Sequence, residues 1–544
     1  MKSLASQGGF PAAGEGVWGG APFKRITVGL GSCGIAAGAD KIYEQLKEKG
    51  LNPTIVGCNG MCHLEPIVTI DGVIQTDDGT PPVLPANRVA LRNCGIIDPT
   101  NIDEYIERGG YKPLTLDPDM IIEKIKESGL CGRGGAGFPT WFKWDACRRA
   151  AGGEKYLICN ADEGDPGAFM DRAILEGDPH SVIEGMIIAA KAIGATEGYI
   201  YVRAEYPLAI ARLEIAISQA KQRGFLRGKN SPAEALGIKL AKGAGAFVCG
   251  EETALIASIQ GERGMPRLKP PFPAEKGLWG SPSNINNVET LANVPWIIHE
   301  NAAANTKVFA VTGKIEKSGL IEVQIGATIN DVLSQCGDTA KIKAVQLGGP
   351  SGGCIPKELF DTEIDYAKLI ATGAIMGSGG MVIMDETTCM VDMARFFLDF
   401  TVKESCGKCT HCRVGNKRML ELLERICAGD GESGDIDLLE DLAEGVKSGS
   451  LCALGQTAPN PVLTTLKYFR DEYIEHIESK TCRAKSCRGL LTYSIDLNKC
   501  KKCGLCVKKC ATNAVSADFS IDSSRCTKCG ICAEVCKFEA VNVL

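Results

Sequence analysis

The stretch Leu130–Trp144, LCGRGGAGFPTWFKW, is the part of the 544-residue chain from which the fold can be worked out. It holds four glycines within the six residues 132–137, with Arg133 among them and Lys143 further on. Glycine lets a backbone adopt positive φ and approach a ligand closely. Successive backbone N–H groups beside a cation form a concavity that binds an anion, most often a phosphate. The alternative is a flexible surface loop, so the prediction depends on later parts of the chain.

Three later stretches favour a buried pocket, because each leads from apolar residues into polar ones. They are Asn160–Gly167 (NADEGDPG), Gly243–Thr253 (GAGAFVCGEET) and Ile285–Thr290 (INNVET). Apolar walls with a few placed polar groups are what a cofactor pocket needs. Together with the glycine-rich stretch they predict one cofactor site built from four loops.

These four stretches resemble the flavin-bearing, NADH-oxidising subunit of respiratory complex I and its soluble relatives, in matching order along residues 116–477. The resemblance implies FMN held without a covalent bond and NAD(H) stacked on it. The residues that it implies for FMN are Gly132, Arg133, Gly134, Gly135, Lys143, Asn160, Asp162, Glu163, Gly250, Glu251, Asn286, Asn287 and Thr290. Those that it places beside NADH are Phe138, Glu252, Lys269 and Phe272, with Glu252 and Glu163 as the catalytic carboxylates. A second stacking aromatic is expected soon after Lys143, where this chain has Ala146.

Composition sets limits on the remaining function classes. A net charge of −6 gives no sign of nucleic-acid binding. We find no apolar run of the roughly 18 residues that a membrane helix needs, and the Gly- and Ala-rich start lacks the features of a signal peptide. The 26 cysteines stand in short-spaced sets, which favours metal sites in a reducing compartment over disulfides. We therefore expect a cytoplasmic protein without a membrane span.

The last 52 residues carry the most specific cysteine pattern. Each half of this block reads C-x2-C-x2-C-x3-C, the spacing of two-cluster bacterial ferredoxins, in which the last cysteine of each half ligates the other cluster. One [4Fe–4S] cluster is thus expected on Cys500, Cys503, Cys506 and Cys536. The other is expected on Cys526, Cys529, Cys532 and Cys510.

A third [4Fe–4S] cluster is expected near residue 410. Cys406, Cys409 and Cys412 form C-x2-C-x2-C, a triplet that binds three corners of a cubane and takes the fourth ligand from elsewhere. The family resemblance names Cys452 as that fourth ligand. This cluster would accept electrons from the flavin first.

The N-terminal cysteines resemble an incomplete [2Fe–2S] set. Cys33, Cys58 and Cys62 fit the thioredoxin-like [2Fe–2S] domains of the same enzyme systems, but the first cysteine of that pattern falls on Val28. Three thiolates cannot complete a four-thiolate cluster. Either another residue completes the expected [2Fe–2S] cluster, with Cys94 as the nearby cysteine, or the cluster is absent.

A zinc site is a further hypothesis, for the segment between the helical and ferredoxin parts. His476, Cys482 and Cys487 lie within twelve residues, and Cys389 is a distant fourth candidate. Zinc takes four such ligands in structural sites. The alternative is two free thiols and a surface histidine.

The predicted fold is multidomain, α/β and α+β. We expect a strand at 25–30, a helix at 36–49, a strand at 53–57 and a hairpin around Asp71-Gly72, then a polar, irregular segment at 99–118. Strand and helix alternation from 119 to 300 favours a mainly parallel sheet, and helices dominate after 392. The expected domains are a flexible arm (1–24), a thioredoxin-like domain (25–98), an FMN/NADH-binding domain (99–305), a ubiquitin-like β-grasp insert (306–366), a helical [4Fe–4S] domain (367–478), a zinc-binding linker (479–492) and a two-cluster ferredoxin domain (493–544).

Three functions are compatible with this layout. The first is the flavin subunit of a soluble electron-bifurcating complex that couples NAD(H), ferredoxin and a third couple such as hydrogen or formate, as in the β subunits that this layout resembles. Its partners would include a small thioredoxin-like [2Fe–2S] subunit and a larger iron–sulfur catalytic subunit. The second is an NADH dehydrogenase module that feeds a quinone-reducing enzyme, and the third is an electron-transfer scaffold without catalysis. The intact glycine loops and the pair Glu251-Glu252 disfavour the scaffold, and the sequence does not separate NAD from NADP.

Overall fold

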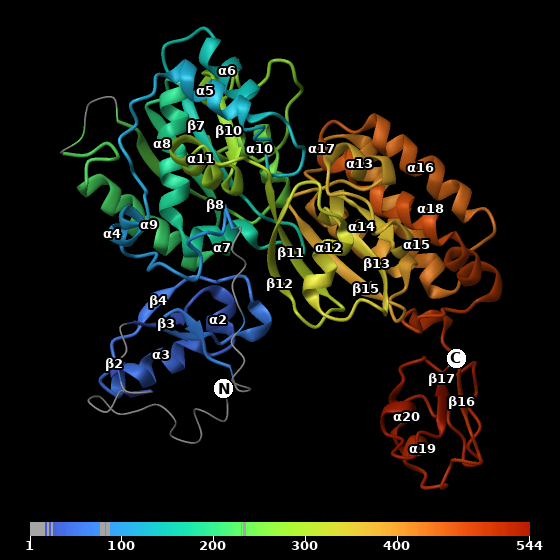
Figure 1. The fold of residues 1–544 in the computed structure, drawn as a ribbon. Coiled ribbons are helices and arrows are strands. Elements are labelled where there is room, and N and C mark those ends of the chain that lie inside the picture. Colours follow the sequence, from blue (N-terminus) through green and yellow to red (C-terminus); the bar gives the residue numbers. More distant parts are fainter. Residues whose placement is uncertain are drawn as a thin grey trace. The chain divides into compact units, whose positions relative to one another are not determined.

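The computed structural model describes residues 17–18, 21–22, 25–76, 82, 88–229, 231 and 235–543 (Figure 1). The fold is mixed α/β and divides into two compact units. The first contains 1–340, 346–352 and 358–383, and the second contains 341–345, 353–357 and 384–544. Most of the arm expected at 1–24 lies outside the described residues. None of the described helices is long and apolar enough to cross a membrane.

The N-terminal part is a small sheet with helices beside it. Its strands run in the order β4 (Thr54–Val56), β3 (Ile26–Gly29), β5 (Val68–Ile70) and β6 (Val73–Ile74). The expected hairpin is confirmed, because β5 and β6 pair antiparallel. The helix expected at 36–49 is present as α3 (Ala39–Glu48), which begins after Gly38, whose φ of 91° is left-handed. A separate short helix, α2 (Ser32–Ala36), precedes it. Val28 lies in the buried core between this sheet and α3.

The segment expected to be irregular at 99–118 contains a helix. Helix α4 (Ile102–Glu107) begins where the side chain of Asn101 accepts a hydrogen bond from the backbone of Asp103. Tyr105 is buried and its ring lies 6.1 Å from that of Trp296. The expectation was wrong because one cap and one buried aromatic stabilise a helix too short for its periodicity to stand out.

Four parallel strands form the centre of the described part of the first unit, in the order β10, β7, β8, β9. They are β7 (Tyr156–Ala161), β8 (Glu197–Arg203), β9 (Gly237–Gly243) and β10 (Ser283–Asn287). The mainly parallel sheet that the alternation predicted is confirmed. The chain moves outward from β7 to β9 and then returns to the opposite side of β7 with β10. The strand order therefore reverses between β7 and β10, the kind of position where open α/β sheets bind ligands.

Several helices accompany this sheet. They are α5 (Pro118–Glu127), α6 (Thr140–Arg149), α7 (Met170–Gly177), α8 (Pro179–Ile193), α9 (Pro207–Gln222), α10 (Glu252–Ile259) and α11 (Val288–Glu300). Helix α8 is apolar on nearly all sides and almost fully buried. It packs closely on α11 at Gly185, where a Cβ would lie 2.1 Å from the carbonyl oxygen of Leu291. The packing of these two helices thus rests on a contact that only glycine allows.

A second sheet follows the flavin part. Strand β11 (Thr306–Gly313) pairs antiparallel with β12 (Gly319–Gln324) and parallel with β15 (Gly380–Asp385). Helix α12 (Ile329–Leu333), β13 (Ile342–Leu347), β14 (Gly353–Pro356) and α13 (Tyr366–Thr372) lie between them in the chain. Strand β15 belongs to this sheet although it lies after residue 366.

The second unit is mostly helical. Its long helices are α14 (Met390–Glu404), α15 (Asn416–Ala428), α16 (Asp435–Gly449) and α18 (Asn460–Ile474), with the short α17 (Ala453–Thr457) before the last. The final block has one antiparallel pair, β16 (Tyr493–Ile495) with β17 (Val541–Val543), and the short helices α19 (Leu505–Lys509) and α20 (Ile531–Glu534). The helices expected to dominate after residue 392 are therefore present.

Candidate functional site

The predicted flavin residues gather at the carboxyl edge of the parallel sheet. Asn160 near the end of β7 lies opposite Asn287 at the end of β10, so the two flank the point where the strand order reverses. Asn160 also donates a hydrogen bond from Nδ2 to the carbonyl oxygen of Gly250, 2.9 Å away. Three of the four loops therefore meet at one place.

The glycine-rich loop is closed at its base by backbone pairing. The N–H of Gly132 donates to the carbonyl of Phe138, and that of Thr140 donates to the carbonyl of Leu130. Gly135 and Gly137 have φ of 132° and 63°, which other residues adopt only with strain. Helix α6 then begins at Thr140 without a side-chain cap, so the N–H groups of its first turn after Thr140 remain for a ligand.

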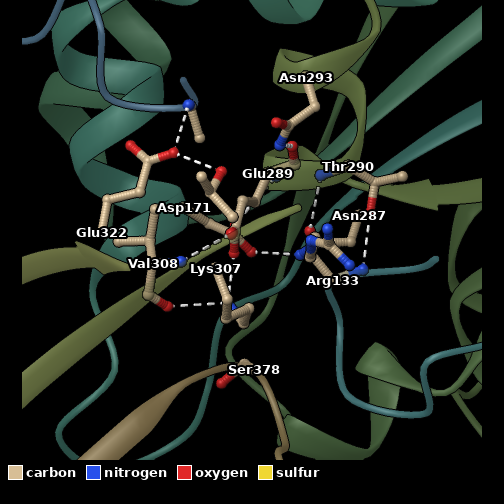
Figure 2. Close-up of polar contacts among 12 residues, drawn as sticks. Arg133, Asp171, Asn287, Glu289, Thr290, Asn293, Lys307, Val308, Glu322 and Ser378 are labelled. Carbon is tan, nitrogen blue, oxygen red and sulfur yellow. Dashed lines mark hydrogen bonds and ion pairs between the residues drawn. The ribbon is translucent and has the colours of Figure 1, made fainter. Parts of the chain in front are cut away.

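Arg133 does not lie where a ligand could use its charge. Its side chain is 1% exposed and donates hydrogen bonds to the carbonyls of Cys131 and Ala304. Its backbone N–H donates to Thr290 Oγ1 over 2.8 Å. Figure 2 shows this arginine beside Thr290 and Asn287. The structure thus gives Arg133 a role in holding the glycine-rich loop to α11.

Beneath the loop lies a set of buried charges, here called the buried network: Arg133, Asp171, Glu289 and Lys307. Lys307 is fully buried and donates to Glu289, which also accepts from the backbone of Val308 (Figure 2). Asp171 accepts from Asn287 over 2.6 Å and from the backbone of Glu289. Burial raises the pKa of the Glu289 carboxyl, and Lys307 and Arg133 oppose that effect. No local sequence pattern marks this network, because its members come from four separate segments.

The carboxylate of Glu163, which was predicted as catalytic, instead accepts hydrogen bonds from the start of α7. It accepts from the backbone N–H groups of Asp171 and Arg172, each over 3.0 Å. Tyr206 donates to the same carboxylate over 3.2 Å. Burial raises the pKa of Glu163 against these hydrogen bonds. The placement makes Glu163 a residue that fixes the loop after β7.

A second group of charges is open to solvent, here called the exposed cluster: Lys143, Glu252 and Lys269. Lys269 donates to Glu252 over 2.8 Å, and Lys143 Nζ lies 3.8 Å from the other oxygen of the same carboxylate. Burial acts to raise the pKa of Glu252, but the positive charges of Lys143 and Lys269 outweigh it and lower that pKa. Burial likewise lowers the pKa of Lys143, opposed by Glu252. The cluster thus holds an ionised carboxylate between two cations at the rim of the site.

Glu251 is used differently from its neighbour. Its Oε2 caps α10 by accepting from the backbone of Thr253 and Ala254, while Lys269 Nζ lies 3.4 Å from its Oε1. The pair Glu251-Glu252 therefore divides into one carboxylate that stabilises a helix and one that faces the site.

Three large aromatic side chains close to these charges in sequence are exposed. Phe138 and Phe272, both predicted to face NADH, are 48% and 52% exposed. Phe142, which the sequence pattern did not single out, is 52% exposed and its ring lies 5.7 Å from that of Phe138. It stands one helical turn before Ala146 on α6, so the two residues lie on the same helix face. Phe142 therefore offers an exposed ring on the helix face where the family has an aromatic and this chain has Ala146.

The cysteines expected to bind the third cubane lie around one place in the helical unit. Cys406 and Cys409 follow α14, Cys412 precedes α15, and Cys452 immediately precedes α17. Burial raises the pKa of Cys412 to about 11, and the nearby sulfurs of Cys409, Cys452 and Cys406 add to the rise. The triplet and the distant Cys452 therefore face one another.

The ferredoxin block brings together cysteines from both halves. A cavity there is lined by Cys500, Cys503, Cys506 and Cys536, which is the crossed set that the spacing predicted for one cluster. In the other half, Cys526 and Cys529 act on the pKa of Cys532, so these three are also neighbours.

Three family models match the chain in the order of these sites. The Nuo51 FMN-binding domain matches residues 125–296. The NADH-ubiquinone oxidoreductase-F iron-sulfur binding region matches 392–476, and the 4Fe-4S binding domain matches 519–542.

Individual relatives extend this match over more of the chain. HndC, a subunit of the NADP-reducing hydrogenase of Solidesulfovibrio fructosivorans, is 52% identical over 449 residues, 79% of this chain and 91% of that one. The second F subunit of NADH-quinone oxidoreductase in Rhizobium meliloti is 44% identical over 414 residues, 72% of this chain and 98% of that one. The chain belongs to the family of NADH-quinone oxidoreductase F subunits. Among solved structures, an NAD+-reducing [NiFe]-hydrogenase in its H2-reduced state has a TM-score of 0.64 and 30% identity, over 84% of this chain and 85% of that one.

As an F-subunit homologue, the chain is a flavoprotein oxidoreductase component with an FMN-binding domain and [4Fe–4S]-binding regions. The residues at the sheet edge fit FMN. The uncapped first turn of α6 and the glycine-rich loop offer backbone N–H groups to a phosphate, and Lys143 lies on the same helix. Arg133 and Glu163 are predicted contacts whose side chains the fold uses for itself.

Two compact ligand groups occur in the described part of this F-subunit homologue besides the cluster cysteines. In the first, Cys389, His476, Cys482 and Cys487 are all buried, with ligand atoms within 4.8 Å of one another. His476 Nε2 lies 3.3 Å from the sulfurs of Cys389 and Cys487, while its Nδ1 lies 2.7 Å from the carbonyl of Glu472. That carbonyl fixes the tautomer with Nε2 free to bind a metal. The four donors fit the predicted zinc site.

The second compact group is Cys33, Cys58 and Cys62, again within 4.8 Å. It does not fit a four-thiolate [2Fe–2S] cluster. Val28 is in the hydrophobic core, and Cys94, the other candidate, is outside the group with its sulfur 3.8 Å from the carbonyl of Ala173. The [2Fe–2S] cluster remains a prediction that lacks a fourth thiolate among the described residues.

Proposed function

We propose that this chain exchanges a hydride with NAD(H) at FMN and passes single electrons to its [4Fe–4S] clusters, within an electron-bifurcating complex. The observation that carries this is the exposed cluster, an ionised Glu252 between Lys143 and Lys269 at the edge where the predicted loops meet. The flavin supplies the conversion between two-electron and one-electron transfer.

The residues of the chain bind and orient the nucleotide. Glu252 is the group placed to hydrogen-bond the substrate and set its approach, and Lys143 and Lys269 keep that carboxylate ionised. Exposed aromatic faces at Phe138, Phe142 and Phe272 suit a stacked adenine, because flat rings stack with little loss of freedom. Orientation of this kind lowers a reaction barrier by several kcal/mol.

The metal centres follow the proposed route. The cysteine sets named above would hold three cubanes, with about four irons each. Cys406, Cys409, Cys412 and Cys452 would hold the one that serves as first acceptor from the flavin. A zinc ion on Cys389, His476, Cys482 and Cys487 joins α14 to the segment before the ferredoxin block and so limits the motion of that block. The thioredoxin-like and β-grasp assignments of the N-terminal part and of the sheet around β11 belong to the same proposal.

Electron bifurcation with ferredoxin and a third couple, hydrogen or formate, is supported by two facts. The relative at 52% identity is a subunit of a hydrogenase by name, and this chain adds N-terminal thiolates and a ferredoxin block to the flavin core. The partners are then NAD(H), ferredoxin, a small thioredoxin-like [2Fe–2S] subunit and a larger iron–sulfur catalytic subunit, in the cytoplasm. The relatives named as parts of NADH-quinone oxidoreductase favour the second candidate, a module that feeds a quinone-reducing enzyme.

The two candidates differ in a direct assay on the purified native complex. Bifurcation predicts that hydrogen or formate reduces ferredoxin only while NAD+ is also present. Ferredoxin reduction that is independent of NAD+, or none with either donor, contradicts bifurcation and favours the quinone-linked module.

The flavin assignment is tested at the glycine-rich loop. Gly134→Val adds a branched side chain where even a Cβ would lie 3.2 Å from Asn287 Cβ, so we expect a protein with its iron but without FMN. The control is Gly153→Val, since a Cβ at Gly153 meets nothing within 4 Å. Released flavin is measured by fluorescence. Full FMN in Gly134→Val, with normal bleaching by NADH, would falsify the assignment.

A further inference from the structure

The sulfurs of Cys33, Cys58 and Cys62 lie closer together than a cluster requires. All three are within 4.8 Å of one another, and Cys58 and Cys62 are 3.5 Å apart. Four ligands around one zinc ion with Zn–S bonds of about 2.3 Å stand about 3.8 Å from one another. Thiolates on the two irons of a [2Fe–2S] cluster are instead separated by the width of the cluster. The spacing is that of a single ion.

The other cysteine sets of the chain provide an internal comparison. Among the described residues, the groups with all ligand atoms within 4.8 Å are this one and the Cys389–His476–Cys482–Cys487 group. The cysteines expected to hold cubanes, all of them within the described ranges, form no such group, and the larger clusters require that wider spacing. The N-terminal group thus shares the geometry of the proposed zinc site and differs from the cluster sites.

A carboxylate stands beside this group. Glu65 Oε1 lies 3.4 Å from Cys33 Sγ, although Glu65 is not among the residues whose ligand atoms all lie within 4.8 Å of one another. Its other oxygen accepts from the backbone N–H of Ile67 over 2.9 Å, which fixes the carboxylate. Gly29 and Gly34 leave room for it, because a Cβ at either would lie 3.3 or 3.0 Å from Glu65 Oε2.

The backbone around the sulfurs is also arranged as in a metal-binding loop. The N–H of Gly60 donates to Cys58 Sγ over 3.3 Å, and Met61 N–H donates to Asn59 Oδ1 over 2.9 Å. Hydrogen bonds that orient the ligands are part of a built metal site.

We propose that Cys33, Cys58, Cys62 and Glu65 bind one divalent zinc ion in place of a [2Fe–2S] cluster. Three thiolates and one carboxylate are donors that zinc accepts in a closed, four-coordinate structural site. The ion fixes the loop from Cys58 to Glu65, whose backbone is hydrogen-bonded to Ser318 and Leu320. It therefore has a structural role, and the proposal does not depend on the flavin chemistry.

The first experiment measures zinc and iron in the full-length chain after anaerobic purification. We expect two zinc ions per chain, one from each compact group, and about twelve irons from three cubanes. Two additional irons with one zinc, or one zinc that is lost in Cys487→Ser, would overturn the proposal.

Variants assign the zinc to its site. Cys58→Ser should lose one zinc and no iron, whereas Cys94→Ser, a buried neighbour outside the group, should lose neither. Iron and FMN content report whether each variant has folded. A loss of two irons in Cys58→Ser would show a [2Fe–2S] cluster instead.

X-ray absorption at the zinc edge identifies the fourth ligand, because the iron of the clusters absorbs at a different energy. In Cys487→Ser, which removes the other zinc, we expect three sulfurs at about 2.3 Å and one oxygen at about 2.0–2.2 Å. Glu65→Cys in the same background should replace that oxygen by a fourth sulfur. An unchanged spectrum in Glu65→Cys would exclude Glu65 as the ligand.

Discussion

The buried network and the exposed cluster each pair lysine with glutamate, but in different surroundings. In the buried network, Lys307 and Glu289 are fully enclosed and pair with each other inside the protein. In the exposed cluster, Lys143, Glu252 and Lys269 keep about a quarter to a third of their side-chain surface in solvent. Charge alone therefore does not mark a ligand contact. A ligand contact is marked by charge that the fold holds in place and leaves accessible.

The largest expected effect is on the buried network. Lys307→Met removes the cation that pairs directly with the buried Glu289 and leaves Arg133 as the other cation of the network. Removing one partner of a buried pair costs about 3–5 kcal/mol. We expect loss of FMN and of the folded flavin domain, measured by thermal unfolding and flavin content. The matched control, Lys269→Met, changes a pair worth at most about 1 kcal/mol. Equal destabilisation by the two variants would remove the distinction between the regions.

The next effect concerns the exposed cluster. Glu252→Gln keeps the shape of the side chain but removes the charge between Lys143 and Lys269. We expect full FMN and iron, with NADH-dependent flavin reduction slowed about tenfold or more, where about 1.36 kcal/mol of barrier is one decade. Stopped-flow bleaching by NADH measures it. Unchanged bleaching would move the orienting role to another residue.

A smaller effect is expected at Phe142. Phe142→Ala removes one exposed ring, and an aromatic contact of about 1 kcal/mol predicts a roughly five-fold higher KM for NADH with kcat little changed. Ala146→Phe in that background should restore the KM, because residues 142 and 146 lie on one face of α6. If neither Phe142→Ala nor the added Ala146→Phe alters the KM for NADH, Phe142 does not contact the nucleotide.

The smallest effect tests a buried carboxylate whose hydrogen bonds come from neutral groups. Asp178 accepts from Asn93 and Ser181, and burial raises its pKa to about 6. Because the folded state binds the proton more tightly, its contribution to stability is present at low pH and is lost as pH rises through the folded pKa of about 6. Between pH 5 and 7 this amounts to about 1 kcal/mol. Thermal unfolding of Asp178→Asn should lack this part of the pH dependence, and an identical dependence would contradict it.

The sequence predicted much of the local structure and less of the charge pairing. Alternation of strands and helices predicted a mainly parallel sheet, Asp71-Gly72 predicted the hairpin, and the helical part after residue 392 was also expected. The order β10-β7-β8-β9 was not predictable, since alternation of strands and helices does not determine which strands are neighbours. Arg133 resembles a ligand contact in the sequence because the carbonyl it binds, that of Ala304, lies 171 residues away. Phe142 does not stand out, because the family pattern places the aromatic near Ala146.

Among the described strands, β12 pairs with β11 on one side only, so its other side is an open row of backbone groups. The loop that carries Cys58 and Cys62 covers part of that row, since the N–H of Leu320 donates to the carbonyl of Gly60. An uncovered edge strand readily pairs with another molecule. With zinc bound as proposed, this loop would make the chain's resistance to aggregation depend on metal supply. Chains made under zinc limitation would be expected to associate through β12 before their flavin chemistry is affected.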